Sequence, residues 1–318
     1  MPEAALTRFA GDWAALNLPE TDRVGLAVSG GPDSCALLVL AAAHAPGQIA
    51  VATVDHGLRA QAADEARAVA ALCADLCVPH HTLRIDLGGG SAIQARARAA
   101  RYAALAGWAR GQGLAALATA HHMDDQAETL TMRLNRGAGV RGLAGMRARA
   151  GVAGDPALPL LRPLLGWRRA ELADVVAAAG VVAADDPSNQ DTRFERVRVR
   201  FGLAGAAWLD PAGWAASAQH LAQADAALDW AAQRLFAQGW DDQQGRLAVP
   251  DGMPQALALR VLELVLQAMG ATPVPRGAEL ARWHAALAAG QVATLAGLRG
   301  EGKGATWHFL RVPPHRAG

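Results

Sequence analysis

Short apolar runs alternate with longer amphipathic stretches through the first half of the chain. Four runs have the length of buried strands, at 24–28, 49–54, 81–87 and 114–120. The stretches around them have helical character, at 3–17, 35–43, 61–78 and 91–111. This alternation predicts an α/β domain with a doubly wound parallel sheet that is buried on both faces.

A glycine-rich turn, Ser29-Gly30-Gly31-Pro32-Asp33-Ser34, separates the first strand from its helix. Pro32 suits the first position of a helix, and two adjacent glycines let the backbone approach a ligand closely. The unpaired N–H groups of a helix N-terminus favour a phosphate. Asp33 stands where a Walker loop would carry its lysine, so it could instead hold a magnesium ion. An ordinary strand-to-helix turn is the alternative.

Further polar side chains follow the second and fourth strands, where parallel sheets bind ligands. Asp55 ends the second strand. After the fourth, His121 and Asp125 are four residues apart, and Asp125 and Glu128 are three apart, so they share one side of a helix. A zinc site or simple helix capping are alternatives. The spacing is not His-Glu-x-x-His, and capping needs fewer charged groups, so we favour a functional cluster.

Composition divides the 318 residues near Asp210–Pro211, beyond which the chain is rich in alanine and tryptophan. We expect a catalytic domain over 1–210 and a smaller, mainly helical domain over 211–318. Helices are predicted at 213–238, 254–269 and 277–289, and short strands at 293–312. Basic and acidic side chains nearly balance in this second part.

The three cysteines form no obvious disulfide framework, and no apolar run has membrane-spanning length. Hence we expect a cytoplasmic protein with no membrane partner.

The net charge is +1, yet the basic residues cluster, and all but Lys303 are arginine. One cluster runs from Arg133 to Arg149, and another from Arg193 to Arg200. In the second, arginines alternate with valines, which fits either a half-buried strand or the start of a helix. The planar guanidinium suits phosphate, although a general bias towards arginine also explains the residue type.

The glycine-rich turn resembles the pyrophosphatase loop of the ATP-pyrophosphatase (PP-loop) superfamily. An ordered set of blocks over 24–200 further resembles the tRNA(Ile)-lysidine synthase family. The blocks are Ser29–Ser34, Asp55–Arg59, Gln94–Arg98 with Arg101–Tyr102, His121–Thr129, Arg133–Gly139, Arg162–Leu164 and Asp186–Asn189.

The resemblance implies ligation of free L-lysine to the wobble cytidine of the AUA-reading tRNA(Ile), whose anticodon is CAU. In that reaction the cytosine oxygen attacks the α-phosphate of ATP and pyrophosphate leaves. The lysine ε-amine then displaces AMP, and lysidine forms. ATP and Mg²⁺ are thus expected, together with a tRNA-recognising C-terminal domain and a homodimer.

Each expected role falls on particular residues. The catalytic set is Asp33, Arg101, Asp125 and Glu128. The ATP-binding set is Ser29, Gly30, Gly31, Pro32, Asp33, Ser34, Asp55 and His121, with Asp33 as magnesium ligand. The lysine-binding set is Asp125, Glu128 and Arg193. The tRNA-binding set is Arg136, Arg196, Arg198 and Arg200.

Three other functions compete with this interpretation. A tRNA thiolase is the nearest, but no Cys-x-x-Cys pair is present. An amide ligase such as an NAD synthetase leaves the arginine-rich 133–200 region unexplained. A nucleotide-binding regulatory module without turnover does not need the carboxylate cluster.

Overall fold

A computed structural model describes the chain except residues 1, 20, 56–60, 87–92, 185–189 and 313–318. The chain forms two compact units, Met1–His220 and Leu221–Gly318. Their boundary falls within α9 (Pro211–Gly239), a continuous helix of 29 residues.

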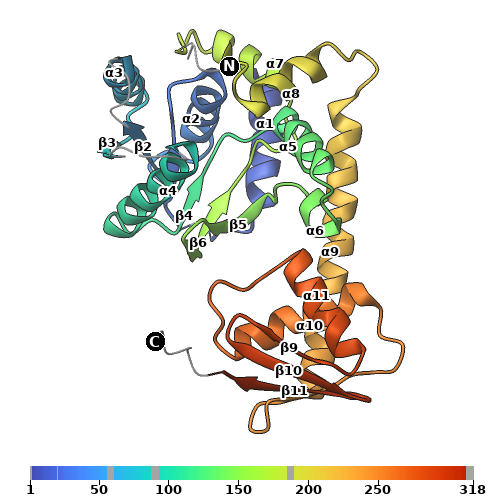
Figure 1. The fold of residues 1–318 in the computed structure, drawn as a ribbon. Helices are drawn as coiled ribbons and strands as arrows, with labels where there is room; N and C mark the ends of the chain where they lie inside the picture. Colours follow the sequence, from blue (N-terminus) through green and yellow to red (C-terminus); the bar gives the residue numbers. More distant parts are fainter. Residues whose placement is uncertain (1, 20, 56–60, 87–92, 185–189, 313–318) are drawn as a thin grey trace. The chain divides into compact units, whose positions relative to one another are not determined.

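The first unit is built on a six-stranded sheet with the order β3-β2-β1-β4-β6-β5 (Figure 1). Its strands are β1 (Val24–Ala27), β2 (Ile49–Asp55), β3 (His80–Arg84), β4 (Ala116–Ala118), β5 (Arg149–Val152) and β6 (Asp155–Leu161). The first four and β6 run parallel, as the alternation of strands and helices predicts.

Two features of this sheet differ from the prediction. The sheet is mixed, because β5 pairs antiparallel with β6 across a two-residue connection, and a tight hairpin can only reverse the chain. The expectation of burial on both faces is also wrong for β3. That strand lies at the sheet edge, and its side chains are partly or fully exposed.

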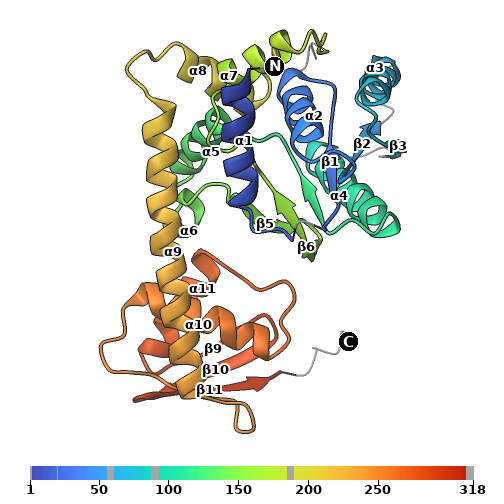
Figure 2. The same cartoon turned by 180° about the vertical axis from the view of Figure 1, so that it is seen from behind.

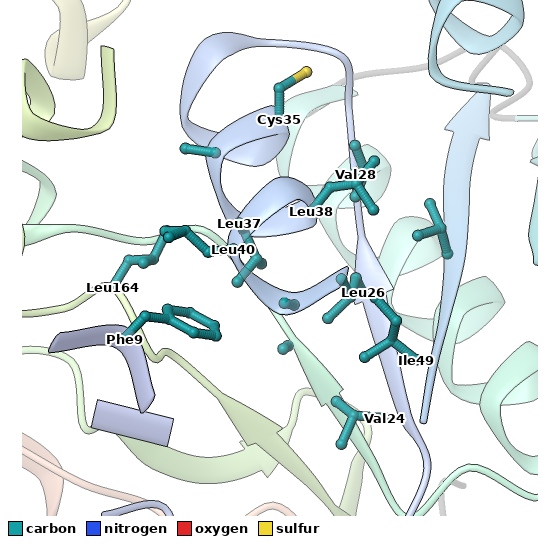
Figure 3. Packing of buried hydrophobic residues seen from close by; sticks show 14 of the residues in the cluster. Phe9, Val24, Leu26, Val28, Cys35, Leu37, Leu38, Leu40, Ile49 and Leu164 are labelled. Carbon is teal, nitrogen blue, oxygen red and sulfur yellow. The ribbon is translucent and has the colours of Figure 1, made fainter. Parts of the chain in front are cut away.

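Helices cover both faces of the sheet (Figures 1 and 2). They are α1 (Glu3–Ala14), α2 (Pro32–His44), α3 (Gln61–Asp75), α4 (Ile93–Gly111), α5 (Met123–Asn135), α6 (Val140–Leu143), α7 (Arg169–Ala178) and α8 (Glu195–Ala204). α1, α2, α3 and α7 share one core with β1 and β2. Figure 3 shows Phe9 and Leu164 beside Leu37 and Leu40 of α2. On the opposite face, Gly25 of β1 leaves room for Trp108 of α4, because a Cβ there would lie 2.6 Å from the indole.

The second unit combines helices with a five-stranded antiparallel sheet of order β7-β8-β11-β10-β9. The helices are α10 (Gln255–Ala268) and α11 (Ala278–Ala288), with the end of α9. The strands are β7 (Trp240–Asp241), β8 (Arg246–Ala248), β9 (Val292–Leu295), β10 (Leu298–Lys303) and β11 (Thr306–Arg311). The unit is therefore not purely helical, because an antiparallel sheet packs with its helices.

The strands predicted over 293–312 are present, whereas β7 and β8 were not predicted. Their two or three residues are too few to show a period in the sequence. In β10, Gly300 and Gly302 let α11 pack closely, since a Cβ at Gly302 would lie 1.9 Å from the Leu287 carbonyl oxygen.

Within the part of the chain that is described, no helix combines the length and apolar character required to span a membrane.

Candidate active site

The sheet reverses its winding at β1, which lies between β2 and β4. The loops that follow β1 and β4 therefore flank one crevice at the carboxyl ends of the strands. A cavity of about 530 Å³ opens there, within the size range of small-molecule sites. It is lined by Ala27, Ser29, Gly31, Pro32, Asp33, Ser34, Arg98, Arg101, Tyr102, Thr119, Ala120, His121, Asp125, Arg169, Ala184, Arg196 and Arg200.

The glycine-rich loop after β1 is closed by its own hydrogen bonds. Ser34 Oγ accepts from the Ser29 N–H at 3.2 Å and donates to the Gly31 carbonyl at 2.9 Å. Gly30 has φ of +91°, which side chains disfavour, and its carbonyl accepts from the Ala184 N–H at 2.9 Å. Pro32 begins α2, with Gly31 as the N-cap. The loop thus presents a helix N-terminus to the cavity, a favourable position for a phosphate.

Asp33 has one carboxylate oxygen in use and one unused. Oδ2 lies 3.3 Å from His122 Nε2, whereas the buried Oδ1 has no hydrogen-bond partner in the described structure. An unpaired buried anionic oxygen fits a cation ligand. The described residues contain no group of three side chains that would hold a metal alone. A magnesium ion here would therefore need oxygens from a ligand as well.

His122, the N-cap of α5, connects the two loops. Its side chain is fully buried, and its backbone N–H donates to Asp125 Oδ2 at 3.1 Å. Burial opposes a charge on this imidazole, but hydrogen bonds with Asp124 and Asp33 and the charge of Asp125 outweigh burial and raise its pKa to about 9. The sequence interpretation assigned this histidine no role.

His121 has the opposite electrostatics, although it is the next residue. Its Nδ1 lies 2.8 Å from Thr119 Oγ1, and the ring lines the cavity. Burial lowers its pKa to about 3; Asp125 opposes that shift, but the charges of Arg162 and Arg196 add to it. His121 is therefore a neutral imidazole near pH 7, able to hydrogen-bond without adding charge.

Asp125 and Glu128 of α5 meet arginines from α8. Arg196 Nε lies 2.6 Å from Glu128 Oε2, and its Nη2 lies 2.6 Å from Asp125 Oδ1. Arg200 Nε lies 2.7 Å from Glu128 Oε1, and Arg169 of α7 lies 3.9 Å from the same oxygen. Burial alone would raise the pKa of Asp125, but His122 and Arg196 lower it overall, so this carboxylate stays ionised.

Arg98 and Arg101 of α4 form the other charged wall of the cavity. Both side chains are exposed, and Arg98 lies 5.1 Å from the centre of the Tyr102 ring. Neither makes an ion pair with a carboxylate among the described residues. Because no carboxylate among the described residues pairs with them, they are suited to bind an anionic ligand.

The structure gathers only some of the predicted site residues. Arg193 is exposed and pairs with Asp191 at 2.7 Å, Arg136 pairs with Glu195, and Arg198 donates to the Thr192 and Arg193 carbonyls at 2.9 Å. These three arginines do not line the cavity, and neither do Gly30, Asp55 and Glu128. Asp55 ends β2 at the same edge of the sheet. The block residues 56–59 and 186–189 lie outside the described residues.

Sequence reasoning assigned no individual role to four groups of this site, although two of them lie in the blocks that carry the resemblance: His122, Thr119, Arg98 and Arg169. Arg98 stands one helical turn before Arg101, and that spacing was a usable signal. Arg169 lies on α7, and no spacing or motif in the sequence indicated that it reaches this site.

The fold and the site define a PP-loop domain. The sequence signature of that family matches residues 4–206, more than half of the chain. Among solved structures, a U34-tRNA thiolase, NcsA from Methanococcus maripaludis, has a similar fold, with a TM-score of 0.56 and 15% identity. The match covers 70% of this chain and 78% of that one.

Curated relatives define the family more closely. The tRNA(Ile)-lysidine synthase of Novosphingobium aromaticivorans is 57% identical, covering 98% of this chain and 95% of that protein. The Zymomonas mobilis protein of the same name is 39% identical, covering 95% and 92%. The chain belongs to the tRNA(Ile)-lysidine synthase family.

Proposed function

We propose that this protein ligates L-lysine to the wobble cytidine of tRNA(Ile) carrying the CAU anticodon, with consumption of ATP. The observation that carries the proposal is 57% identity, over nearly the whole chain, to a tRNA(Ile)-lysidine synthase. The cavity agrees with this chemistry, because its lining combines a phosphate-binding loop, two arginines without an ion pair among the described residues, and the carboxylates of Asp33 and Asp125.

ATP would lie between the glycine-rich loop and α4. Ser29, Gly31, Pro32 and Ser34 face the departing pyrophosphate, and Gly30 supplies the turn. Arg101 and Arg98 stabilise negative charge as the α-phosphate is attacked. His121 hydrogen-bonds the nucleotide as a neutral ring, and Asp55 contributes from the end of β2.

Mg²⁺ fits the site through Asp33, whose Oδ1 lacks a partner in the described structure. The ion would supply charge neutralisation on the phosphates. His122 holds the other oxygen, Oδ2, in place by a contact of 3.3 Å.

The lysine side chain would approach Asp125 and Glu128. Both carboxylates are buried, and Arg196 already pairs with each of them. The lysine ammonium would therefore share these carboxylates with Arg196. Arg193 would bind the lysine carboxylate, which requires exchange of its exposed pair with Asp191. The side-chain ammonium of the lysine substrate would thus bind the buried Asp125 and Glu128, and the carboxylate of the substrate would bind the exposed Arg193.

The tRNA would contact arginines of α8 and Arg136, which follows the end of α5. Arg196 and Arg200 would meet the nucleotide that enters the cavity, and Arg136 and Arg198 would meet phosphates outside it. We infer a catalytic domain over 1–210, a tRNA-recognising domain over 211–318, a homodimer and a cytoplasmic location.

Incorporation of radiolabelled lysine into an unmodified tRNA(Ile) transcript tests the proposal. We expect incorporation that requires ATP and that disappears when the wobble cytidine is replaced by uridine. AMP formation without lysine transfer would contradict the lysine assignment and move the function to another PP-loop activity. Sulfur incorporation would instead favour a thiolase.

A further inference from the structure

Two large aromatic side chains, one on α8 and one on the segment that follows it, face solvent. Trp208, between α8 and α9, is 82% exposed, and Phe201 on α8 is 52% exposed. Figure 1 shows this connection in yellow, beyond the end of α8. Tryptophan is strongly buried on average, so exposure of this degree calls for a physical reason.

α8 connects Phe201 to the active site. One side of the helix sends Arg196 and Arg200 to the carboxylates of α5. Arg198 and Phe201 are three residues apart and share the solvent side, where both are exposed. One short helix therefore carries cavity arginines on one side and an aromatic–arginine pair on another.

Ion pairs connect the Trp208 segment to the same site. Asp210, two residues further on, lies 3.8 Å from Arg168 Nη1. The Nε of Arg168 lies 3.5 Å from Asp124 Oδ1, in the first turn of α5. These exposed ion pairs connect the segment that carries Trp208 to the first turn of the helix that bears Asp125 and Glu128, while Trp208 itself stays exposed.

We propose that Trp208 and Phe201 form a stacking platform for unpaired bases of the RNA substrate, beside the cavity that receives the target base. The inference rests on the proposed function. A base that enters the cavity must leave its stack, and its neighbours then lose a stacking partner. An exposed indole or phenyl ring replaces that partner for any base, because every base has a π face.

The charges around the platform favour RNA over an apolar protein partner. Residues 193–200 contain four arginines and one glutamate, and Arg193 and Arg198 are exposed. Guanidinium groups next to aromatic rings bind the phosphates that flank a stacked base. An apolar protein interface would instead be depleted of charge at its centre.

The affinity of Trp208→Ala for an unmodified tRNA(Ile) transcript tests the platform, without ATP or lysine. We expect the dissociation constant to rise about 5- to 100-fold, because one stacked base is lost. Trp208→Phe keeps a ring and should retain most of the affinity, and Phe201→Ala should show a smaller loss. The KM values for ATP and lysine should remain those of the wild type.

Trp230→Ala is the matched control. Trp230 is also a surface tryptophan, 62% exposed, but it lies in the second unit beneath Arg234. Because that unit is proposed to recognise tRNA, any loss of affinity in Trp230→Ala should be equal for the intact transcript and for one with an abasic site beside the wobble cytidine, unlike the loss in Trp208→Ala.

A transcript with an abasic site beside the wobble cytidine separates stacking from other effects. The wild-type protein should bind this abasic transcript about as weakly as Trp208→Ala binds the intact one. Trp208→Ala should bind the abasic transcript no more weakly than the wild-type protein does. The proposal would be overturned if the losses of affinity from Trp208→Ala and from the abasic site added up. A dissociation constant of Trp208→Ala within twofold of the wild-type value would also overturn it. A change in the oligomeric state or melting temperature of Trp208→Ala that accounts for its loss of affinity would overturn the proposal as well.

These outcomes are distinct from failure of the proposed function. A wild-type enzyme that forms lysidine while Trp208→Ala binds tRNA normally leaves the function intact and removes only the platform. A wild-type enzyme that forms no lysidine removes the function itself.

Discussion

Two buried carboxylate–arginine networks, one in each unit, have similar composition and different surroundings. In the first unit Asp125 and Glu128 pair with Arg196, Arg200 and Arg169. In the second, Arg260 of α10 pairs with Asp225 and Asp229 of α9, where Arg260 and Asp225 are about 10% exposed or less.

The surroundings distinguish a site from a structural ion pair. Asp125, Arg196, Arg200 and Arg169 line the 530 Å³ cavity, as does Asp33, whose Oδ1 has no hydrogen-bond partner among the described residues. None of the three residues of the second network lines that cavity. A cluster of charges alone therefore does not identify an active site; access and uncompensated groups do.

Asp33→Asn should give the largest effect. We expect ATP-dependent lysine incorporation to fall about 100- to 1,000-fold, because a positioned group that stabilises developing phosphate charge is lost. Asp64→Asn, which removes an exposed i,i+3 partner of Arg67 on α3, should leave the rate unchanged. A normal rate in Asp33→Asn would refute the loop assignment.

Glu128→Gln compared with Asp225→Asn directly tests the contrast between the networks. Glu128→Gln should raise the KM for lysine about tenfold and more than the KM for ATP, and should cost about 2 kcal/mol of stability since it leaves arginines unpaired. Asp225→Asn should destabilise the second unit by about 3 kcal/mol and leave both KM values unchanged. Steady-state kinetics and denaturant unfolding provide the measurements. Equal increases in the two KM values of Glu128→Gln would remove the lysine role.

Arg101→Met should act on ATP and not on stability. Because Arg101 has no carboxylate partner in the described structure, its loss leaves no unpaired anion. We expect kcat/KM for ATP to fall about tenfold, the amount expected for one lost charged hydrogen bond. The unfolding midpoint should be unchanged or slightly higher. A large loss of stability would show that Arg101 is structural.

His284 of α11 should give the smallest effect, confined to the second unit. Burial lowers its pKa, and its Nδ1 has no partner in the described part of the chain. Below about pH 6.5 the unfolded chain therefore binds a proton that the folded chain does not. The free energy of unfolding then decreases as the pH is lowered, by at most about 1.4 kcal/mol per pH unit.

His284→Phe should reduce this pH dependence, while the ring still packs against Trp307, which His284 meets edge-on at 5.7 Å. Unfolding midpoints at pH 5 and pH 7 provide the measurement, with His308→Phe on the neighbouring strand as control. An unchanged slope in His284→Phe would assign the pH dependence to other groups.

Local patterns predicted much of the first unit. The apolar runs located β1, β2 and β4, and Pro32 marked the start of α2. The run at 81–87 was interpreted as a strand buried on both faces, because sequence alone does not show which strand lies at an edge. The 193–200 segment fitted a strand or a helix, and packing of α8 on α5 decides for the helix.

The sequence by itself determined the family, the phosphate-binding turn and the side of α5 that carries Asp125 and Glu128, because each depends on residues close together in the chain. Only the tertiary structure decided how those groups are charged and paired. Asp33 meets His122 across 89 positions and Glu128 meets Arg196 across 68. Burial lowers the pKa of His121, whereas the carboxylates around His122 outweigh its burial and raise its pKa. Such long-range proximity and desolvation arise only when the chain has folded, and they turn a set of charged residues into a site.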